Sequence, residues 1–408
     1  MYYCMPYKSC SLFGSLRYLS CIKNSVSLIN GPSGCAFFNR NNIVVVNGYY
    51  TAIEKVQIPK IFSIDFDEQD VIFGAQSKME KAIDDIIKKY DPEVVFLFNC
   101  CVSEVIGEDI DSLAKQKQTE HGTLVLPVHS AGFKGDHKFG MRMACDILFD
   151  NFFCHSNEKC EDRVNILGDL DYHNRSSKVL IDVLNEIGIN NINHIPGNAS
   201  VNELMKASSA SLNIVTCENA SRHLANKFLD NSNIPYIGND SGLYGIDNTY
   251  KTCLEIYNFF NKSASKLDML YQSSKKDLHE IRVKLEGKKA FIVAGTRRAI
   301  GYSNILKELG IEIQVIFSES EEKYINKNDF LPFSENVLLN ESPEDLATII
   351  EKERPDFILS TLSELIAPHK YVKRLSDDFA GFTGSKRMGE YLLSSINSDD
   401  RTYLRIQE

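Results

Sequence analysis

Val94–Ile110 reads VVFLFNCCVSEVIGEDI, and this stretch determines the fold that the sequence predicts. The first five residues of the stretch form an apolar run of strand length, and Cys101 follows close to the carboxyl end of that run. A glycine and an acidic patch then open a helix, which is how an open α/β sheet presents a ligand-binding residue. The stretch therefore predicts a strand that ends in a functional thiol, and that thiol needs partners from elsewhere in the chain.

Alternating strand-like and helix-like segments continue through the chain. They predict an α/β fold of three doubly wound Rossmann-like units with parallel sheets around a central cleft. We expect an N-terminal domain at 1–155, a second domain at 156–265, a helical connection at 266–287, and a third domain with a C-terminal helical segment at 288–408. Within the first domain, the β-branched run at 43–46 predicts a buried strand.

The composition is that of a globular protein. Of the 408 residues, 43% are hydrophobic and 25% are charged, which suits two or three domains with full cores. The formal charge of −10 comes from interleaved signs, so we expect no nucleic-acid partner. No run approaches the roughly 18 apolar residues of a membrane span, and the N-terminus lacks the basic-then-apolar order of a signal peptide. We therefore expect a cytoplasmic protein with no membrane partner.

The chain contains eleven cysteines, an odd and irregularly spaced set. Because a reducing compartment disfavours structural disulfides, this set indicates buried thiols or metal ligands. Cys10, Cys35 and Cys101 lie far apart in the chain and form no CxxC motif, so their spacing alone predicts no metal site. For each of them, a buried small apolar side chain and a metal ligand both remain open.

Several short segments of the first 150 residues, taken in order, resemble the component 1 proteins of nitrogenase and their relatives. Those relatives include cofactor-assembly scaffold proteins and tetrapyrrole reductases. The matching segments are Cys10, Gly31–Cys35, Phe62–Phe66 with Asp70–Gly74, Cys101 with Ile106–Ile110, and Pro127–Val128 with Gly132–Gly135.

The resemblance implies that Cys10, Cys35 and Cys101 bind an iron–sulfur cluster at a subunit interface, either a [4Fe–4S] cluster or a larger P-cluster-like form. Thiolates suit iron, and the glycine-rich backbone around Gly34 can approach the sulfurs and tune the cluster. The implied partner is a second copy of the chain or a homologous subunit. We expect Cys100 to point to the other side of the strand, because side chains alternate along a strand.

Looser matches imply a second site in the rest of the chain. Cys217 follows the run Leu212–Thr216 and precedes a helix, whose dipole favours a thiolate. The resemblance implies that Cys217 anchors a second metallocluster, while a buried structural cysteine remains the alternative. Arg297 lies in a strand–Gly–x–Arg element. The resemblance implies that its guanidinium points at the cofactor and holds an anionic group. His137 is a candidate proton donor near the substrate, with a surface or hydrogen-bonded histidine as the alternative.

Two departures from the family pattern bear on the reaction. Nitrogenase proper carries a glutamine and a histidine in the helix where this chain has His137 and Met141. The stretch Asp377–Phe382 also lacks the histidine through which the family's catalytic subunit binds its cofactor. These departures argue against dinitrogen reduction.

The leading interpretation is an oxidoreductase subunit that accepts electrons from an ATP-dependent reductase resembling the nitrogenase Fe protein. The chain has no phosphate-binding loop of its own, so the partner would hydrolyse the ATP. The substrate would lie in the interdomain cleft near Cys217 and Arg297. Two alternatives stay open, a non-catalytic scaffold for metallocluster assembly and a tetrapyrrole reductase subunit.

Overall fold

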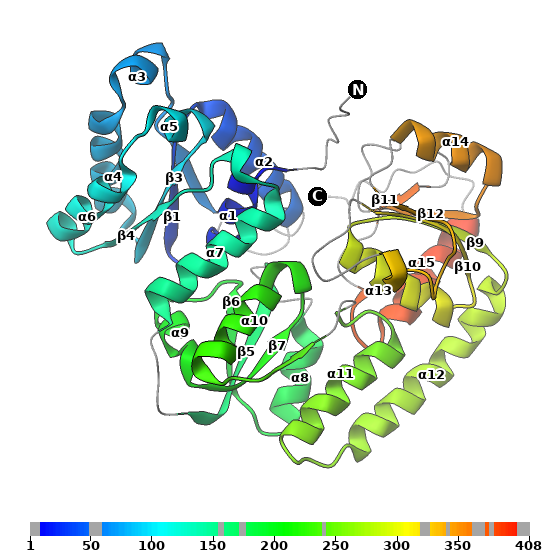
Figure 1. Ribbon diagram of the computed structural model, residues 1–408. Helices are drawn as coiled ribbons and strands as arrows, with labels where there is room; N and C mark the ends of the chain where they lie inside the picture. Colours follow the sequence, from blue (N-terminus) through cyan, green and yellow to red (C-terminus); the bar gives the residue numbers. More distant parts are fainter. Residues whose placement is uncertain are drawn as a thin grey trace.

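The computed structural model describes residues 9–48, 59–153, 159–170, 177–238, 242–318, 327–339, 343–360, 372–374 and 379–397. They form three units, each with a parallel β-sheet at its centre and helices packed on it (Figure 1). The predicted α/β fold with three Rossmann-like units is thereby confirmed. Among the described residues, no helix combines the length and the apolar character needed to span a bilayer.

The first unit holds a four-stranded sheet in the order β2-β1-β3-β4. At its centre β3 (Val94–Asn99) pairs with β1 (Ser25–Asn30), and every residue of both strands is buried. The predicted strand of the opening stretch is thus present and ends one residue before Cys100. The other elements are β2 (Lys60–Ser63), β4 (Leu124–Val128), α1 (Ser11–Leu19), α2 (Ser33–Gly48), α3 (Glu68–Phe73), α4 (Gln76–Tyr90), α5 (Cys101–Ile106), α6 (Ile110–His121), η1 (Gly132–Lys134) and α7 (His137–Phe152).

The predicted strand at 43–46 is wrong, because these residues belong to α2, which runs unbroken from Ser33 to Gly48. One of the two strands that pair with β3 is β1, whose sequence SVSLIN is half polar. Its buried Asn30 donates from Nδ2 to Oδ1 of Asn99 at 3.0 Å, so the amide N–H of this polar side chain has a partner across the sheet. The β-branched residues favour a strand locally, but the helix that starts directly after Pro32 overrides that preference.

The second unit has the strand order β6-β5-β7-β8, with β5 (Cys160–Asp169) and β7 (Ala210–Val215) at the centre. As predicted, a helix, α10 (Glu218–Ser232), begins directly after Cys217. The other elements are β6 (Asn191–Pro196), β8 (Tyr236–Gly238), α8 (Lys178–Glu186), α9 (Val201–Lys206), η3 (Ala207–Ser209) and α11 (Ile246–Phe259).

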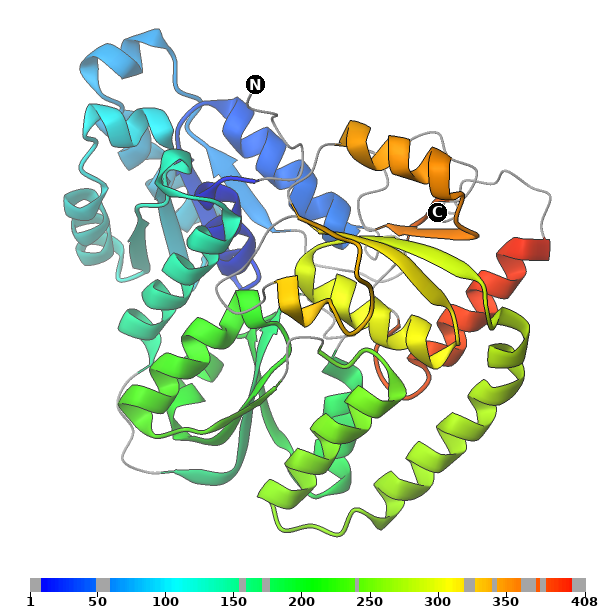
Figure 2. The same ribbon diagram turned by 45° about the vertical axis from the view of Figure 1, so that its right-hand side comes forward.

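The third unit follows the long helix α12 (Ser265–Leu285). Figure 2 shows α12 along the outer edge of the molecule, leading from the second unit to the third. The five strands of the third sheet stand in the order β11-β10-β9-β12-β13. The elements are β9 (Lys289–Val293), β10 (Glu312–Ser318), β11 (Val337–Leu339), β12 (Phe357–Ser360), β13 (Val372–Arg374), α13 (Thr296–Glu308), η4 (Lys327–Asp329), α14 (Pro343–Glu353) and α15 (Gly384–Asn397).

Hydrophobic cores extend from each unit into the next. One core joins Phe96 of β3 to Phe228 of α10, and another joins Ile214 of β7 to Ile292 of β9. Each unit therefore buries apolar surface against its neighbour. We propose residues near 155, 265 and 287 as the boundaries between the segments.

Candidate functional site

Three cysteines distant in sequence stand at the beginnings of three helices of the first unit. Cys10 is the N-cap of α1, Cys35 lies in the first turn of α2, and Cys101 is the first residue of α5. Cys10 and Cys35 are half-buried, while Cys101 is exposed. Because a helix N-terminus favours a thiolate, α1 and α2 suit these cysteines for metal binding.

The three thiols lie close to one another. A Cβ added at Gly132 would stand 3.0 Å from the Sγ of Cys101 and 3.4 Å from the Sγ of Cys10. The thiol of Cys35 interacts electrostatically with both of these cysteines, and each of them raises its pKa. The structure thus brings together the three cysteines that the sequence singled out, and glycine at position 132 leaves the space between them open.

Polar contacts fix the loop that carries Gly132 against α1. The backbone of Cys10 pairs with Asp136 in an antiparallel bridge, and Ser11 donates from its backbone N–H to Gly135 O at 2.9 Å. On the other side of the loop, Lys134 forms an ion pair with Glu104 of α5, the helix that starts at Cys101. The loop therefore holds α1 and α5 together at the cysteines.

Cys100 turns away from Cys101, because its buried Sγ lies against Gly31 whereas the exposed Sγ of Cys101 lies near Gly132. Its contact with Cys35 was not expected. The strand ends at Asn99, and Cys100 is the N-cap of α5, where the alternation of a strand no longer applies. Its thiol makes a hydrogen bond with the thiol of Cys35. In this pair the hydrogen bond raises the pKa of Cys35 and lowers the pKa of Cys100 to about 5.

Gly34 lies beside Cys35 in the first turn of α2 and is exposed. A Cβ added at Gly34 would meet no atom of the described chain within 4 Å. Neither packing within the chain nor a positive φ requires glycine here. No described residue of this chain fills the space beside Gly34, so that space is open to a bound group.

The cysteine group fits an iron–sulfur cluster better than a single metal ion. In the described part of the chain, only one set of three or more potential metal ligands has all of its ligand atoms within 4.8 Å of one another. That set is Asp84, Glu120 and His121. The three cysteine sulfurs are thus more widely spaced than the ligands of one ion. In a cluster each thiolate binds a different iron, which requires such wider spacing.

The Asp84 set itself is a surface ion-pair network. Lys117 Nζ stands 2.7 Å from Asp84 and 2.9 Å from Glu120, so a lysine already neutralises both carboxylates. We assign it no metal.

Cys217 and Arg297 come together from the second and third units. Cys217 is the N-cap of α10, and its Cβ and backbone N each lie 3.1 Å from a Cβ added at Gly168. Arg297 is the second residue of α13, and its Nη2 lies 2.9 Å from a Cβ added at Gly242. That same position is 3.2 Å from the carbonyl oxygen of Thr216, the residue before Cys217. The structure therefore places the Arg297 guanidinium next to the Cys217 segment, as the sequence led us to expect.

His137 lies in the first unit with the cysteine group. It begins α7, and its backbone N–H donates to Ser9 O at 2.9 Å, next to Cys10. Burial is the main cause that lowers the pKa of His137 to about 4. The ring is therefore neutral near pH 7 and has no imidazolium proton to donate at that pH.

Acid should destabilise the protein through His194 on β6. Its Nδ1 is buried with no hydrogen-bond partner among the described residues, and burial lowers its pKa to about 4. In the unfolded chain the ring titrates near pH 6.5, so its contribution to stability is complete above that pH and is lost as pH falls from about 6.5 towards 4. We expect the urea midpoint to fall between pH 7 and pH 5, and to fall less in His194→Gln. An equal fall in both proteins would assign the acid sensitivity to other groups.

Exposed apolar side chains surround the cysteine group on the helices and the loop that carry it. Phe37 follows Cys35 on α2 and is 69% exposed, Val105 follows Cys101 on α5 and is 74% exposed, and Phe133 follows Gly132 and is 60% exposed. We call the following set the interface patch: Phe37, Phe38, Val105, Ile106 and Phe133. Large exposed apolar patches mark interaction sites.

Comparison with known proteins covers nearly the whole chain. The model of the family described as Nitrogenase component 1 type Oxidoreductase matches residues 10–395. The nitrogenase iron-molybdenum cofactor biosynthesis protein NifE of Clostridium pasteurianum is 29% identical, over 96% of this chain and 88% of the relative. NifE of Methanosarcina barkeri is 25% identical over 96% and 89%. The nitrogenase molybdenum-iron protein alpha chain of M. barkeri is 26% identical over 72% of this chain and 56% of its own length.

A solved structure described as nitrogenase Cp1 at pH 6.5 has the same fold. It superimposes with a TM-score of 0.80 at 20% identity, over 96% of this chain and 89% of the other. The family match extends through all three units and includes Cys10, Cys35, Cys101, Cys217 and Arg297. The chain therefore belongs to the nitrogenase component 1 type oxidoreductase family.

Proposed function

We propose that the chain is an iron–sulfur subunit that accepts electrons from an ATP-dependent reductase resembling the nitrogenase Fe protein and uses them on a group bound beside Cys217 and Arg297. The observation that carries the proposal is the grouping of Cys10, Cys35 and Cys101 inside an exposed apolar patch. Their thiolates would hold a [4Fe–4S] cluster or a larger P-cluster-like form. One-electron transfer is the chemistry that such a cluster supplies when bound.

The interface patch supports a partner subunit at the cysteine group. Cys101 is exposed, and Val105 lies one helical turn further along α5. A partner that covers both residues would bury apolar surface and exclude water from the thiolates. We propose that this partner is a second copy of the chain or a homologous subunit.

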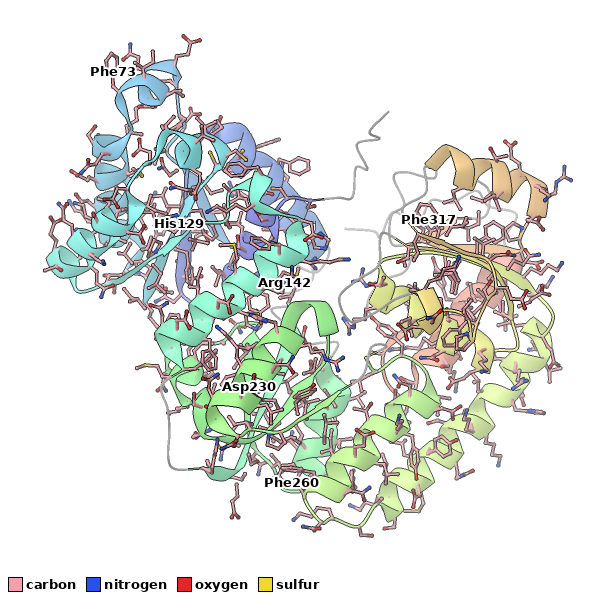
Figure 3. All side chains as sticks on the ribbon, viewed as in Figure 1. Phe73, His129, Arg142, Asp230, Phe260 and Phe317 are labelled. Atoms are coloured by element: carbon pink, nitrogen blue, oxygen red, sulfur yellow. The ribbon has the colours of Figure 1, made fainter. Side chains whose placement is uncertain are left out.

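A second exposed apolar surface supports a docking site for the reductase. Val71, Ile72 and Phe73 end α3, and Phe73, at the tip of the first unit in Figure 3, is 85% exposed. The helix α3 contacts α5, and the first residue of α5 is Cys101. The exposed tip is therefore in direct contact with the helix that carries one of the three cysteines. We expect Phe73→Ser to slow electron uptake driven by reductase and ATP while the iron content stays unchanged. An unchanged rate would place the reductase elsewhere.

A second candidate function is a scaffold on which a metallocluster is assembled. Two relatives that match 96% of this chain are named for cofactor biosynthesis, and 377–382 contains no histidine; of that stretch, Asp377 and Asp378 lie outside the described residues. In a scaffold, the group beside Cys217 is cargo. The Cys217 thiolate would bind it, and the Arg297 guanidinium would hold its negative charge by charge-assisted hydrogen bonds. A tetrapyrrole reductase is the remaining candidate, and it needs no metal at Cys217.

Metal analysis of Cys217→Ala and turnover with reductase and ATP separate these candidates. If a cluster binds at Cys217, the variant loses a second iron population and keeps the first, whereas Cys253→Ala, which removes a buried cysteine elsewhere, keeps both. Full iron retention in Cys217→Ala would contradict a cluster there and favour the tetrapyrrole reductase. Continuous substrate-dependent consumption of ATP and reductant indicates an enzyme. Release of the second iron population to a cluster-free component 1 protein indicates a scaffold.

Gly34→Ala tests whether the open side of Gly34 faces the cluster. The fold should tolerate the added methyl group, because no described atom lies within 4 Å of it, and alanine is favoured over glycine in a helix by about 1 kcal/mol. We therefore expect an unchanged or slightly raised urea midpoint together with a reduced iron content. Normal iron content in the variant would remove Gly34 from the cofactor site.

A further inference from the structure

A polar cavity of about 490 Å³ lies between α11, α12 and α13. These three helices stand where the second unit meets the third, and α11 contacts both of the others (Figure 1). Small-molecule sites occupy roughly 300–1,000 Å³, so the cavity has the size of such a site. It lies at the opposite end of α13 from Arg297 and is therefore separate from the site beside Cys217.

The two carboxylates that line the cavity already have partners within the protein. Glu308 caps α11 and accepts a hydrogen bond from the hydroxyl of Ser385. Asp247 accepts a hydrogen bond from the hydroxyl of Tyr271 at 2.8 Å. Lys275 Nζ stands 2.6 Å from Asp247 and 3.8 Å from Glu308, so one lysine compensates both negative charges. The cavity is therefore not suited to a metal cation.

Two further cationic side chains line the cavity without a strong acidic partner. Lys307 of α13 forms no ion pair with any described acidic residue, and its Nζ stands 5.9 Å from the ring of Phe333. Arg282 of α12 has Glu286 as its described partner at 3.7 Å, and both side chains are about half exposed or more. Such a surface pair is weak. The cavity thus has an excess of positive charge, although the whole chain carries a formal charge of −10.

Two neutral hydrogen-bonding groups add to this excess of donors. Asn304 of α13 is half-buried in the wall of the cavity, and His279 of α12 lies at its exposed side. Neither side chain makes a hydrogen bond within the part of the chain that the structure describes. Both groups can therefore donate to a bound molecule.

We propose that this cavity binds a small phosphate-bearing anion between α12 and α13. A phosphate group carries about −1.5 to −2 charges near pH 7 and offers three strong acceptor oxygens, whereas a carboxylate carries a single charge. Arg282 and Lys307 supply the matching positive charge, and a guanidinium can bind two phosphate oxygens at once. The Asn304 amide and the His279 ring supply further hydrogen bonds. This site requires no iron, so it stands apart from the proposed function.

Isothermal titration calorimetry with pyrophosphate, at constant ionic strength, tests the proposal on the full chain. The variants are Arg282→Gln and Lys307→Gln, and Lys284→Gln is the matched control, because Lys284 is an exposed cation of α12 that does not line the cavity. We expect wild type and the control to bind pyrophosphate equally. Each cavity variant should bind about tenfold more weakly, because it loses one charge-assisted hydrogen bond. Since both side chains are exposed, the urea midpoint and the iron content should stay unchanged.

A parallel titration with adenosine diphosphate distinguishes the sources of the phosphate group. Tighter binding of the nucleotide than of pyrophosphate would assign the cavity to a nucleotide, and the reverse order would assign it to a free phosphate anion. Absence of binding to both probes would overturn the proposal. Unchanged binding in the two cavity variants, or equal weakening in Lys284→Gln, would overturn it too, because the anion would then bind elsewhere or respond to net charge alone. An iron-free protein would contradict the proposed function and leave this inference standing.

Discussion

Replacing Glu308 with glutamine is expected to lower the free energy of unfolding by about 3 kcal/mol. The Glu308 side chain is 7% exposed at the end of α13 and accepts the backbone N–H groups of Ile246 at 3.0 Å and Asp247 at 2.9 Å. These are the first residues of α11, whose N-cap is a glycine with no capping side chain. Glu308 therefore caps a helix of the second unit from the third unit.

A further donor makes glutamine unable to replace the carboxylate. The hydroxyl of Ser385 donates to the same side chain at 2.5 Å, and Lys275 lies 3.8 Å from it. Both carboxylate oxygens thus face donors, and the NH₂ group of glutamine would turn a donor towards one of them. Chemical denaturation of both proteins measures the loss.

Glu286→Gln is the matched control for Glu308→Gln. Glu286 is 63% exposed and its described partner, Arg282, lies 3.7 Å away. Such a surface pair contributes about 0–1 kcal/mol. If the two glutamine variants lost equal stability, Glu308 would not act as the cap of α11.

Gly140→Ala is expected to destabilise the protein by about 2 kcal/mol and to reduce the bound iron. A Cβ at Gly140 would stand 1.9 Å from the backbone oxygen of Ser11, and a Cβ at Gly14 would stand 1.8 Å from the backbone oxygen of His137. The helices α1 and α7 therefore touch through two glycines. An added methyl group has to push α1 away, and α1 begins at Cys10. The gain in helix propensity, about 1 kcal/mol, offsets only part of the cost.

Urea unfolding and iron analysis of Gly140→Ala check both parts of this expectation. Gly34→Ala is the matched control for stability, because it adds the same methyl group to a helix of the same unit without a described neighbour. Wild-type stability in Gly140→Ala would show that the two helices separate easily. A loss of stability together with a normal iron content would show that the position of α1 does not determine how much iron the cysteines bind.

The sequence predicts the parts of the site that lie at the ends of regular strands. Both Cys101 and Cys217 follow apolar runs, and in the structure both stand where a strand gives way to a helix. The resemblance of the first 150 residues added Cys10 and Cys35, which no periodicity could have joined to Cys101. Arg297 was found in the same way, from a strand followed by Gly295.

Other features depend on contacts that sequence patterns do not encode. The strand β1 was missed because half of its residues are polar, and the contact that Asn30 makes with Asn99 across the sheet leaves no sequence pattern. The contact between Cys100 and Cys35 was missed because the alternation was extended one residue past the end of β3. The cap that Glu308 provides joins residues 62 positions apart and leaves no signal near either of them.

The most direct measurement of the central claim is iron counting with EPR on protein purified without oxygen, comparing wild type with Cys35→Ala. We expect wild type to contain iron with the EPR signal of a reduced iron–sulfur cluster, and Cys35→Ala to lose that signal and the iron of that cluster while remaining folded. Cys253→Ala, which removes a buried cysteine outside the group, should behave as wild type. A fully folded wild type without iron, or a Cys35→Ala variant that keeps the cluster, would contradict the claim that Cys10, Cys35 and Cys101 hold it.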